Sequence, residues 1–157
     1  MNIVFKLMNQ KDAEVISNWR YDGPIAFYNA EIDHEDLQEL LDPRRRGYHY
    51  YSAFDGDRLA GYFSFHYERE TRITTVGLGL APNLTGKGLG GIFVKKGLAF
   101  GVKTFPGTSV FKLSVAAFNK RAVKVYEEAG FRLIGKSFME INGGVYRFLH
   151  MEKVTAA

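Results

Sequence analysis

The feature that most constrains this chain is a strand, a glycine-rich loop and a helix in direct succession. Val76 to Leu80 has the pattern of a short apolar strand, and Pro82 ends it because proline lacks the amide hydrogen of a strand ladder. The loop from Thr85 to Gly91 holds four glycines in seven residues. It runs into apolar residues at helical spacing: Ile92, Phe93, Val94, Leu98 and Phe100. Backbone amides and the positive end of a helix dipole then meet in one place, which predicts a phosphate or pyrophosphate site.

The glycines alone leave two interpretations open. The loop has neither the full G-x-G-x-x-G dinucleotide pattern nor the Gly-Lys-Ser/Thr of a P-loop. A glycine cluster between a strand and a helix can be an anion cradle, and it can also be only a tight turn. The second motif of the chain decides between them.

That motif follows the next predicted strand, Val110 to Val115. It reads Asn-x-x-Ala-x-x-x-Tyr-x-x-x-Gly-Phe and consists of Asn119, Ala122, Tyr126, Gly130 and Phe131. With the loop, it resembles the GNAT-type acyl-CoA-dependent N-acetyltransferase superfamily, whose other signature is a strand ending near a proline followed by Gln/Arg-x-x-Gly-x-Gly/Ala. Gly88 and Gly90 match the glycines of that signature, whereas Thr85 stands where the family usually carries Gln or Arg. This departure affects one side-chain contact to the cofactor phosphates and leaves the backbone cradle intact.

The resemblance covers essentially the whole chain and implies a fold of the α/β class, one GNAT-type domain over residues 1–157. The expected architecture is a mixed, mostly antiparallel sheet of six to seven strands, splayed at its centre and flanked by helices. The sequence pattern agrees with it. Expected strands are 3–7, 48–54, 59–68, 76–80, 110–115, 131–141 and 145–154, with hairpin turns at Asp55-Gly56 and around 142–144. A first helix follows Asn9 or Asp12 as its cap, and a second spans 33–41.

Composition narrows the functional classes. A chain of 157 residues that is 46% hydrophobic and 24% charged is an ordinary globular protein with room for a core. It has no cysteine, which excludes disulfides, thiolate metal sites and cysteine nucleophiles, and we expect no metal. Lys6 and Lys11 interrupt the amino-terminal stretch before a long apolar run forms. We therefore expect neither a signal peptide nor a membrane segment, and a cytoplasmic protein.

The chain is basic: its net charge at pH 7 is +4 and its pI is about 9.2. Its single run of three basic residues, Arg44 to Arg46, follows Asp42-Pro43 and has no interleaved aromatic residues. We interpret that run as a solvated turn and expect no specific nucleic acid partner. A positive field also suits a cofactor that carries several phosphates.

The resemblance assigns the cofactor site, with acetyl-CoA as the cosubstrate. Backbone groups of Leu78, Gly79 and Leu80 are implied to contact its pantetheine arm and to polarise the thioester carbonyl. The loop is implied to hold the pyrophosphate through Thr85, Gly86, Lys87, Gly88, Leu89 and Gly90. Glycines within a strand, here Gly77 and Gly79, indicate either a bulge or a close backbone approach.

The helix after Asn119 is implied to complete the site with Asn119, Ala122 and Tyr126. Tyr126 is the expected general acid, because a phenol titrates near pH ~10 and can give its proton to a departing thiolate. It follows Asn119 by seven residues, two helical turns along one face. Asn119 either contacts the cofactor or only caps its helix.

The general base is not identified by the sequence. Many relatives carry a glutamate on the central strand, and this chain has none between Ile73 and Leu78. Glu68, Glu70 and His66 lie nearby as candidates, and a water chain or an acceptor amine of low pKa needs no dedicated base.

The acceptor is expected on the side of an aromatic segment that includes Trp19, Phe27 and Tyr28, although these side chains equally suit core packing. Without cysteine, and with Ser114 in no known nucleophile motif, we expect direct transfer. A peptide or protein amino terminus and a small primary amine remain rival acceptors. The competing function is an acyl-CoA-binding sensor without turnover. A monomer or a homodimer is expected.

Overall fold

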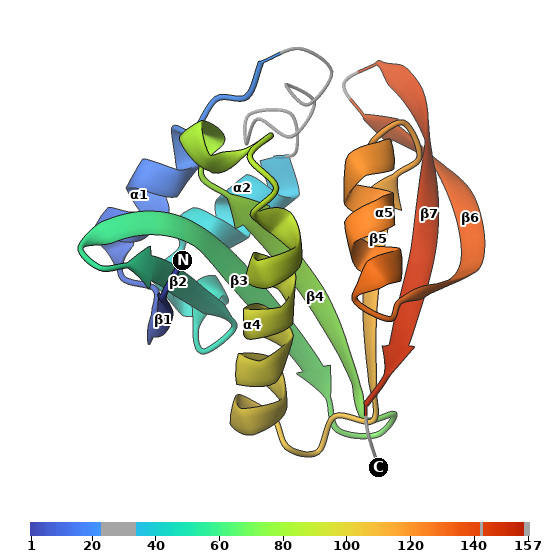
Figure 1. Ribbon diagram of the computed structural model, residues 1–157, viewed down its shortest axis with the longest axis horizontal. Helices are drawn as coiled ribbons and strands as arrows, with labels where there is room; N and C mark the ends of the chain where they lie inside the picture. Colours follow the sequence, from blue (N-terminus) through green and yellow to red (C-terminus); the bar gives the residue numbers. More distant parts are fainter. Residues whose placement is uncertain (23–33, 142, 156–157) are drawn as a thin grey trace.

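The computed structural model describes residues 1–22, 34–141 and 143–155 (Figure 1). Its strands are β1 (Ile3–Leu7), β2 (Tyr50–Asp55), β3 (Arg58–Glu68), β4 (Ile73–Leu80), β5 (Val110–Ala116), β6 (Arg132–Ile141) and β7 (Gly144–Val154). Its helices are α1 (Gln10–Ser17), α2 (His34–Leu41), α3 (Pro43–Arg46), α4 (Gly90–Thr104) and α5 (Lys120–Glu128), with a 3₁₀ turn at Pro82–Leu84.

The strands form one seven-stranded sheet in the order β1-β2-β3-β4-β5-β7-β6. Every neighbouring pair is antiparallel except β4 and β5, which are parallel. These two strands pair only from Ile73 to Thr75 with Val110 to Lys112. Beyond that point they separate, as Figure 1 shows toward its top. The predicted mixed, mostly antiparallel and centrally splayed sheet is confirmed.

Helices cover both faces of the sheet. Helices α4 and α5 lie on one face, and α1 and α2 lie behind the other (Figure 1). The main core lies under α4, where Phe63 and Phe65 of β3 meet Phe93 and Phe111. A Cβ atom at Gly97 would overlap the Phe63 ring, so a residue without a side chain allows α4 to pack this closely.

A second, smaller core joins α1 and α2 to β2. Met8, Ile16, Leu40 and Tyr50 are buried there, and Trp19 packs on them half-buried. The cap of α1 is Asn9, whose Oδ1 accepts the amide of Asp12 at 2.8 Å.

The prediction of a solvated turn at Arg44 to Arg46 is wrong for Arg46. The run forms the short helix α3, capped by Asp42, and Arg46 is only 4% exposed. Its guanidinium donates to the carbonyl of Leu40 at 2.6 Å and to Oε1 of Gln10 at 3.1 Å. The reason is physical: α2 ends at Leu41, and a last-turn carbonyl inside the core needs a donor.

Other boundaries differ by a few residues. The strand predicted to begin at Tyr48 begins at Tyr50, because α3 and its turn occupy the intervening residues. The predicted first residue of the second helix, Asp33, lies outside the described residues.

Candidate functional site

The separation of β4 from β5 leaves one edge of β4 open. From Val76 to Leu80 this strand pairs with β3 on its other edge, and no described strand pairs with the edge that faces β5. The side chains of Leu78 and Leu80 pack into the main core, so it is their backbone, with that of Gly79, that borders the opening. Such an edge can hydrogen-bond an extended ligand as an added strand does.

Gly77 and Gly79 allow a close approach on the opposite face of β4. A Cβ at Gly77 would lie 2.5 Å from Oγ of Ser64, and one at Gly79 would lie 2.5 Å from Cε1 of Tyr62. The β3–β4 register has no shift. Of the two interpretations of these glycines, close approach is therefore the one observed. It brings Tyr62 directly against the backbone at the opening.

The glycine-rich loop connects β4 to α4 through two glycines in the left-handed conformation. Gly86 and Gly88 have φ of +73° and +74°, a conformation that side-chain-bearing residues rarely adopt. A Cβ at Gly88 would meet no atom within 4 Å. Helix α4 starts at Gly90, and no described side chain caps it, because its cap residue is Leu89. The first amides of the helix are thus open to a ligand, as an anion site requires.

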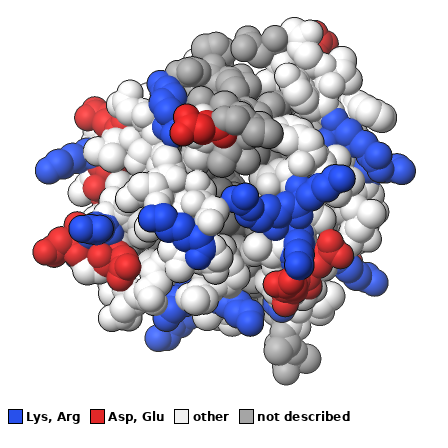
Figure 2. All heavy atoms as spheres, turned by 45° about the horizontal axis from the view of Figure 1, so that its top comes forward, with Lys and Arg blue, Asp and Glu red and all other residues white. Residues whose placement is uncertain are grey.

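Arg121 of α5 reaches this loop, which sequence reasoning missed. Its Nη1 would lie 3.3 Å from a Cβ on Gly86, and Cγ2 of Val125, also on α5, would lie 3.4 Å from a Cβ on Gly90. The hydroxyl of Thr85 donates to the carbonyl of Pro82 at 2.8 Å and so closes the 3₁₀ turn. Lysine and arginine side chains occupy much of the centre of the face drawn in Figure 2.

The three predicted residues around α5 have distinct positions. Asn119 caps the helix, with Oδ1 accepting the amide of Ala122 at 3.3 Å, and the methyl group of Ala122 packs on the main core. Tyr126 is half-buried, with its ring edge-on to Phe131 at 6.0 Å between centroids. The motif therefore orders α5 beside the glycine-rich loop, and Tyr126 keeps part of its surface exposed.

A cluster of tyrosines and a glutamate lies on the α1–α2 face beside β4. The hydroxyl of Tyr21 donates to the carbonyl of Leu80 at 2.7 Å, and that of Tyr50 donates to Oε1 of Glu39 at 2.9 Å. Burial raises the pKa of Tyr62 to about 12, and the charge of Asp36 adds to the effect. Burial also raises the pKa of Tyr21 and, with the negative charge of Glu39, that of Tyr50. These phenols stay neutral at physiological pH, and those of Tyr21 and Tyr50 serve as hydrogen-bond donors.

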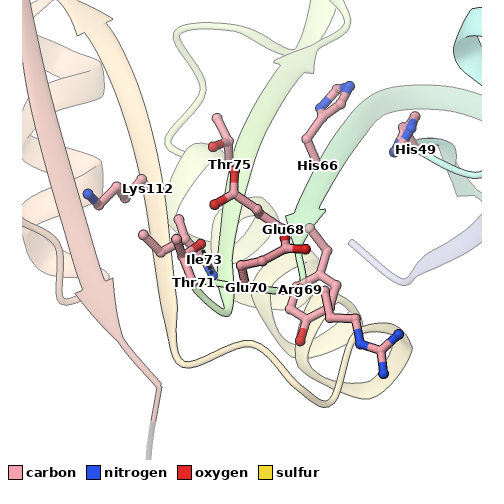
Figure 3. A pocket seen from close by; sticks show the side chains of 10 residues that line it. His49, His66, Glu68, Arg69, Glu70, Thr71, Ile73, Thr75 and Lys112 are labelled. Atoms are coloured by element: carbon pink, nitrogen blue, oxygen red, sulfur yellow. Dashed lines mark hydrogen bonds between the residues drawn. The ribbon is translucent and has the colours of Figure 1, made fainter.

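The three candidate bases line one pocket of about 590 Å³. Glu68 and Glu70 are exposed, whereas His66 projects from β3 next to Thr75 (Figure 3). The Nε2 atom of His66 lies 2.6 Å from Oε1 of Glu39. The pocket also includes Lys112, which pairs with Thr75 where β4 and β5 part. The structure thus brings a histidine and its carboxylate partner to the start of the opening.

The far wall of the opening carries a chain of hydrogen bonds. Oγ of Ser114 on β5 lies 2.8 Å from Nδ1 of His150 on β7, and Oγ of Ser137 on β6 lies 2.8 Å from Nε2. The sequence alone does not predict the contact of Ser114 with His150, because the two residues are 36 positions apart.

The predicted acceptor-side aromatics are only partly described. Trp19 packs half-buried in the small core of α1 and α2 and is absent from the pocket lining. Phe27 and Tyr28 lie outside the described residues.

Comparison with protein families decides the identity. The profile of the Acetyltransferase (GNAT) family matches residues 13–131, most of the chain. The chain belongs to the GNAT acetyltransferase family. Among curated proteins, no sequence matches it significantly.

Solved structures similar to this GNAT protein agree in fold. A chimera of Vibrio cholerae spermidine N-acetyltransferase and hSSAT has a TM-score of 0.80 at 21% identity, covering 98% of this chain and 96% of its own. The Vibrio cholerae spermidine N-acetyltransferase in complex with CoA and spermine gives 0.78 at 22% identity, over 97% and 95% of the two chains. A GNAT-family acetyltransferase from Bacillus anthracis gives 0.75 at 16% identity, over 98% and 95%.

Two features are absent from residues 1–22, 34–141 and 143–155. No helix there is both long and apolar enough to cross a membrane. In the same ranges, no group of three or more His, Asp or Glu side chains has an arrangement that suits a metal ion.

Proposed function

We propose that this GNAT protein transfers the acetyl group of acetyl-CoA directly to a primary amine. The observation that carries the proposal is the open edge of β4 leading into an uncapped, glycine-lined helix start. An acyl-CoA needs an extended partner for its pantetheine arm and an anion cradle for its pyrophosphate, and the two lie here end to end.

The residues present fit acetyl-CoA. Gly86, Gly88 and the first turn of α4 offer backbone amides to phosphate oxygens, with the guanidinium of Arg121 beside them. Leu78 and Gly79 offer backbone groups along the edge of β4 to the arm and the thioester carbonyl. We assign the six loop residues from Thr85 to Gly90 to the pyrophosphate.

The reaction needs two proton movements. The amine nitrogen forms a bond to the thioester carbonyl carbon and gives up a proton, and the carbon–sulfur bond breaks. Tyr126 of α5, whose ring is half-buried against Phe131, gives its proton to the departing thiolate. Amides of β4 stabilise the charge that develops on the carbonyl oxygen.

A small cationic amine is the acceptor that we favour over a peptide amino terminus. The α1–α2 face at the opening carries Tyr50, Tyr62 and Glu39, and the pocket carries Glu68 and Glu70. Neutral phenols and carboxylates attract an ammonium group. The structural neighbour solved with CoA and spermine supports the same class.

Acceptor-dependent release of free thiol from acetyl-CoA tests the proposal, using spermidine, simple primary amines and short peptides with free amino termini. We expect release with small amines and little with peptides. Release with peptides alone would contradict the acceptor class. Acetyl-CoA binding without release by any acceptor would support the sensor instead.

Tyr126→Phe tests the role of the phenol in the same assay. The variant should bind acetyl-CoA as wild type does and lose about 10²-fold in rate, because general acid catalysis contributes at least that much. The matched control is Tyr48→Phe, which alters a side chain that is 77% exposed and should leave the rate unchanged. Loss of acetyl-CoA binding by Tyr126→Phe would contradict the assigned role.

A further inference from the structure

His66 and Glu39 form a hydrogen-bonded pair that neither motif of the chain includes. The pair joins β3 to α2 across 27 positions of sequence, with Nε2 of His66 at 2.6 Å from Oε1 of Glu39. The same Oε1 accepts the hydroxyl of Tyr50 at 2.9 Å. The ring of His49 stacks on that of His66 with centroids 4.4 Å apart. The carboxylate of Glu39 and the rings of His49 and Tyr50 thus fix the orientation of the His66 imidazole.

The pair lies where the acceptor must enter. His66 pairs with Thr75, and Thr75 is the last residue of β4 that pairs with β5. The adjoining residues of the same face of β4 are Gly77 and Gly79, which add no side chain between β3 and the opening. Figure 3 shows His66 and Thr75 on neighbouring strands of the pocket. An amine bound in this pocket reaches the thioester end of the opening from the side of His66.

The partner of Nε2 determines what the ring can do. An ionised carboxylate only accepts hydrogen bonds, so the proton shared with Glu39 belongs to Nε2. The lone pair then lies on Nδ1, which has no hydrogen bond to any described residue. A neutral imidazole in this tautomer accepts a proton at Nδ1, and the carboxylate stabilises the resulting imidazolium.

The other nearby groups are less suited to this role. His49 uses Nδ1 on the carbonyl of Phe65 at 3.1 Å. Both ring nitrogens of His150 are engaged by serine hydroxyls. Glu68, at the end of β3, and Glu70, in the turn that follows, are exposed. The titratable and charged groups near His66 on its face of the sheet and in the pocket are Glu39, His49, Tyr50, Asp36, Glu68, Arg69, Glu70 and Lys112.

We propose that His66 accepts the proton of the acceptor amine and that Glu39 is the positioning residue that holds it in the required tautomer. The inference rests on the proposed acetyl transfer and names its base. The ammonium loses a proton to Nδ1, directly or through one water, and its nitrogen then forms the bond to the thioester carbonyl carbon. That proton leaves to solvent through the exposed side of the pocket. The new carbon–nitrogen bond leaves one further proton on the nitrogen, which is released as the carbon–sulfur bond breaks and replaces the proton that Tyr126 gives to the thiolate.

The pH dependence of kcat/KM tests this proposal with His66→Gln, Glu39→Gln and, as a control on the far wall, His150→Gln. Wild type should lose activity toward acid pH, because a protonated imidazole cannot accept the proton of the amine; this loss is the acid limb of the profile. In His66→Gln, kcat/KM should be about 10²-fold lower at neutral pH, the acid limb should be absent, and activity should recover toward alkaline pH, where the amine deprotonates unaided. In Glu39→Gln, kcat/KM should fall while the acid limb remains, because His66 is present but the carboxylate no longer holds its ring. His150→Gln should behave as wild type, and all variants should bind acetyl-CoA alike.

Nitrogen-15 NMR of the histidine rings gives a readout that does not require turnover. Wild type should show His66 as the Nε2–H tautomer, and Glu39→Gln should reduce its population. An Nδ1–H tautomer in wild type, or an acid limb unchanged in His66→Gln, would overturn the assignment of His66 while leaving acetyl transfer intact. No acceptor-dependent release by wild type would overturn the proposed function and this inference together.

Discussion

Single residues in the glycine-rich loop show how this chain departs from its family pattern. The hydroxyl of Thr85 donates to the carbonyl of Pro82, and its short side chain cannot make the contact that a glutamine or arginine would make. The guanidinium beside Gly86 belongs to Arg121, from a different element. We infer that Arg121 supplies the phosphate contact that Thr85 lacks.

Arg121→Gln tests this at the residue scale. A charge-assisted hydrogen bond contributes about 1.5–3 kcal/mol, so the variant should bind acetyl-CoA about tenfold or more weakly, with a smaller dependence on salt. The control is Arg45→Gln, which removes an exposed guanidinium from α3. Titration calorimetry at two salt concentrations measures both. Equal affinity of Arg121→Gln and wild type would contradict the inference.

At the scale of elements, a buried arginine holds α1, α2 and α3 together. Arg46 donates to the Leu40 carbonyl of α2 and to Gln10 of α1, and its guanidinium has almost no access to water. This arrangement sets the position of α2 over the sheet, and α2 carries Glu39. The orientation of His66 therefore depends on a contact outside the pocket.

Arg46→Ala should lower the free energy of unfolding by about 1–3 kcal/mol, because it leaves the Leu40 carbonyl without its donor. Arg45→Ala, the exposed neighbour, should change it by less than about 0.5 kcal/mol. Urea denaturation of both variants compares them directly. A loss from Arg45→Ala as large as that from Arg46→Ala would exclude the buried hydrogen bonds as the cause.

At the scale of the whole molecule, the sheet separates two environments around one opening. The α4–α5 face supplies the main core and the glycine-rich loop, and the α1–α2 face supplies a cluster of tyrosines with raised pKa values. A phenol whose pKa rises on folding binds its proton more tightly in the folded state. Its contribution to stability is complete below the unfolded value of ~10 and is lost as pH rises toward the folded value.

The free energy of unfolding should therefore fall as pH rises from about 10 toward 12, and Tyr62→Phe should make that fall shallower, because the pKa of Tyr62 is about 12. Tyr48→Phe, at a position 77% exposed, should leave the slope as in wild type. Chemical denaturation at a series of alkaline pH values gives the slopes. A steeper fall in Tyr62→Phe would mean that the sign of this linkage is wrong.

The sequence predicts the parts of this account that depend on neighbouring residues. The glycine-rich loop at Gly86 and Gly88 and the succession of strands along the chain follow from local patterns, and the structure agrees. The splayed, mixed sheet was implied by the family resemblance. The pair of His66 with Glu39 and the approach of Arg121 to Gly86 depend on how distant elements pack. The burial of Arg46 was not predicted for the same reason. A run of three basic residues does not indicate that one of them will donate a hydrogen bond to a carbonyl at the end of a helix.

The central claim is that acetyl-CoA binds along the open edge of β4 and against the glycine-rich loop. Calorimetric titration of acetyl-CoA into wild type, Gly88→Asp and Gly56→Asp tests it most directly. Both glycines have positive φ, +74° and +63°, and a Cβ at either would meet no atom within 4 Å, so the two variants carry the same backbone strain. Only Gly88 lies in the cradle, where a carboxylate would repel phosphate. We expect wild type and Gly56→Asp to bind acetyl-CoA and Gly88→Asp to show no detectable binding. No binding by wild type, or equal binding by all three, would contradict this placement of acetyl-CoA.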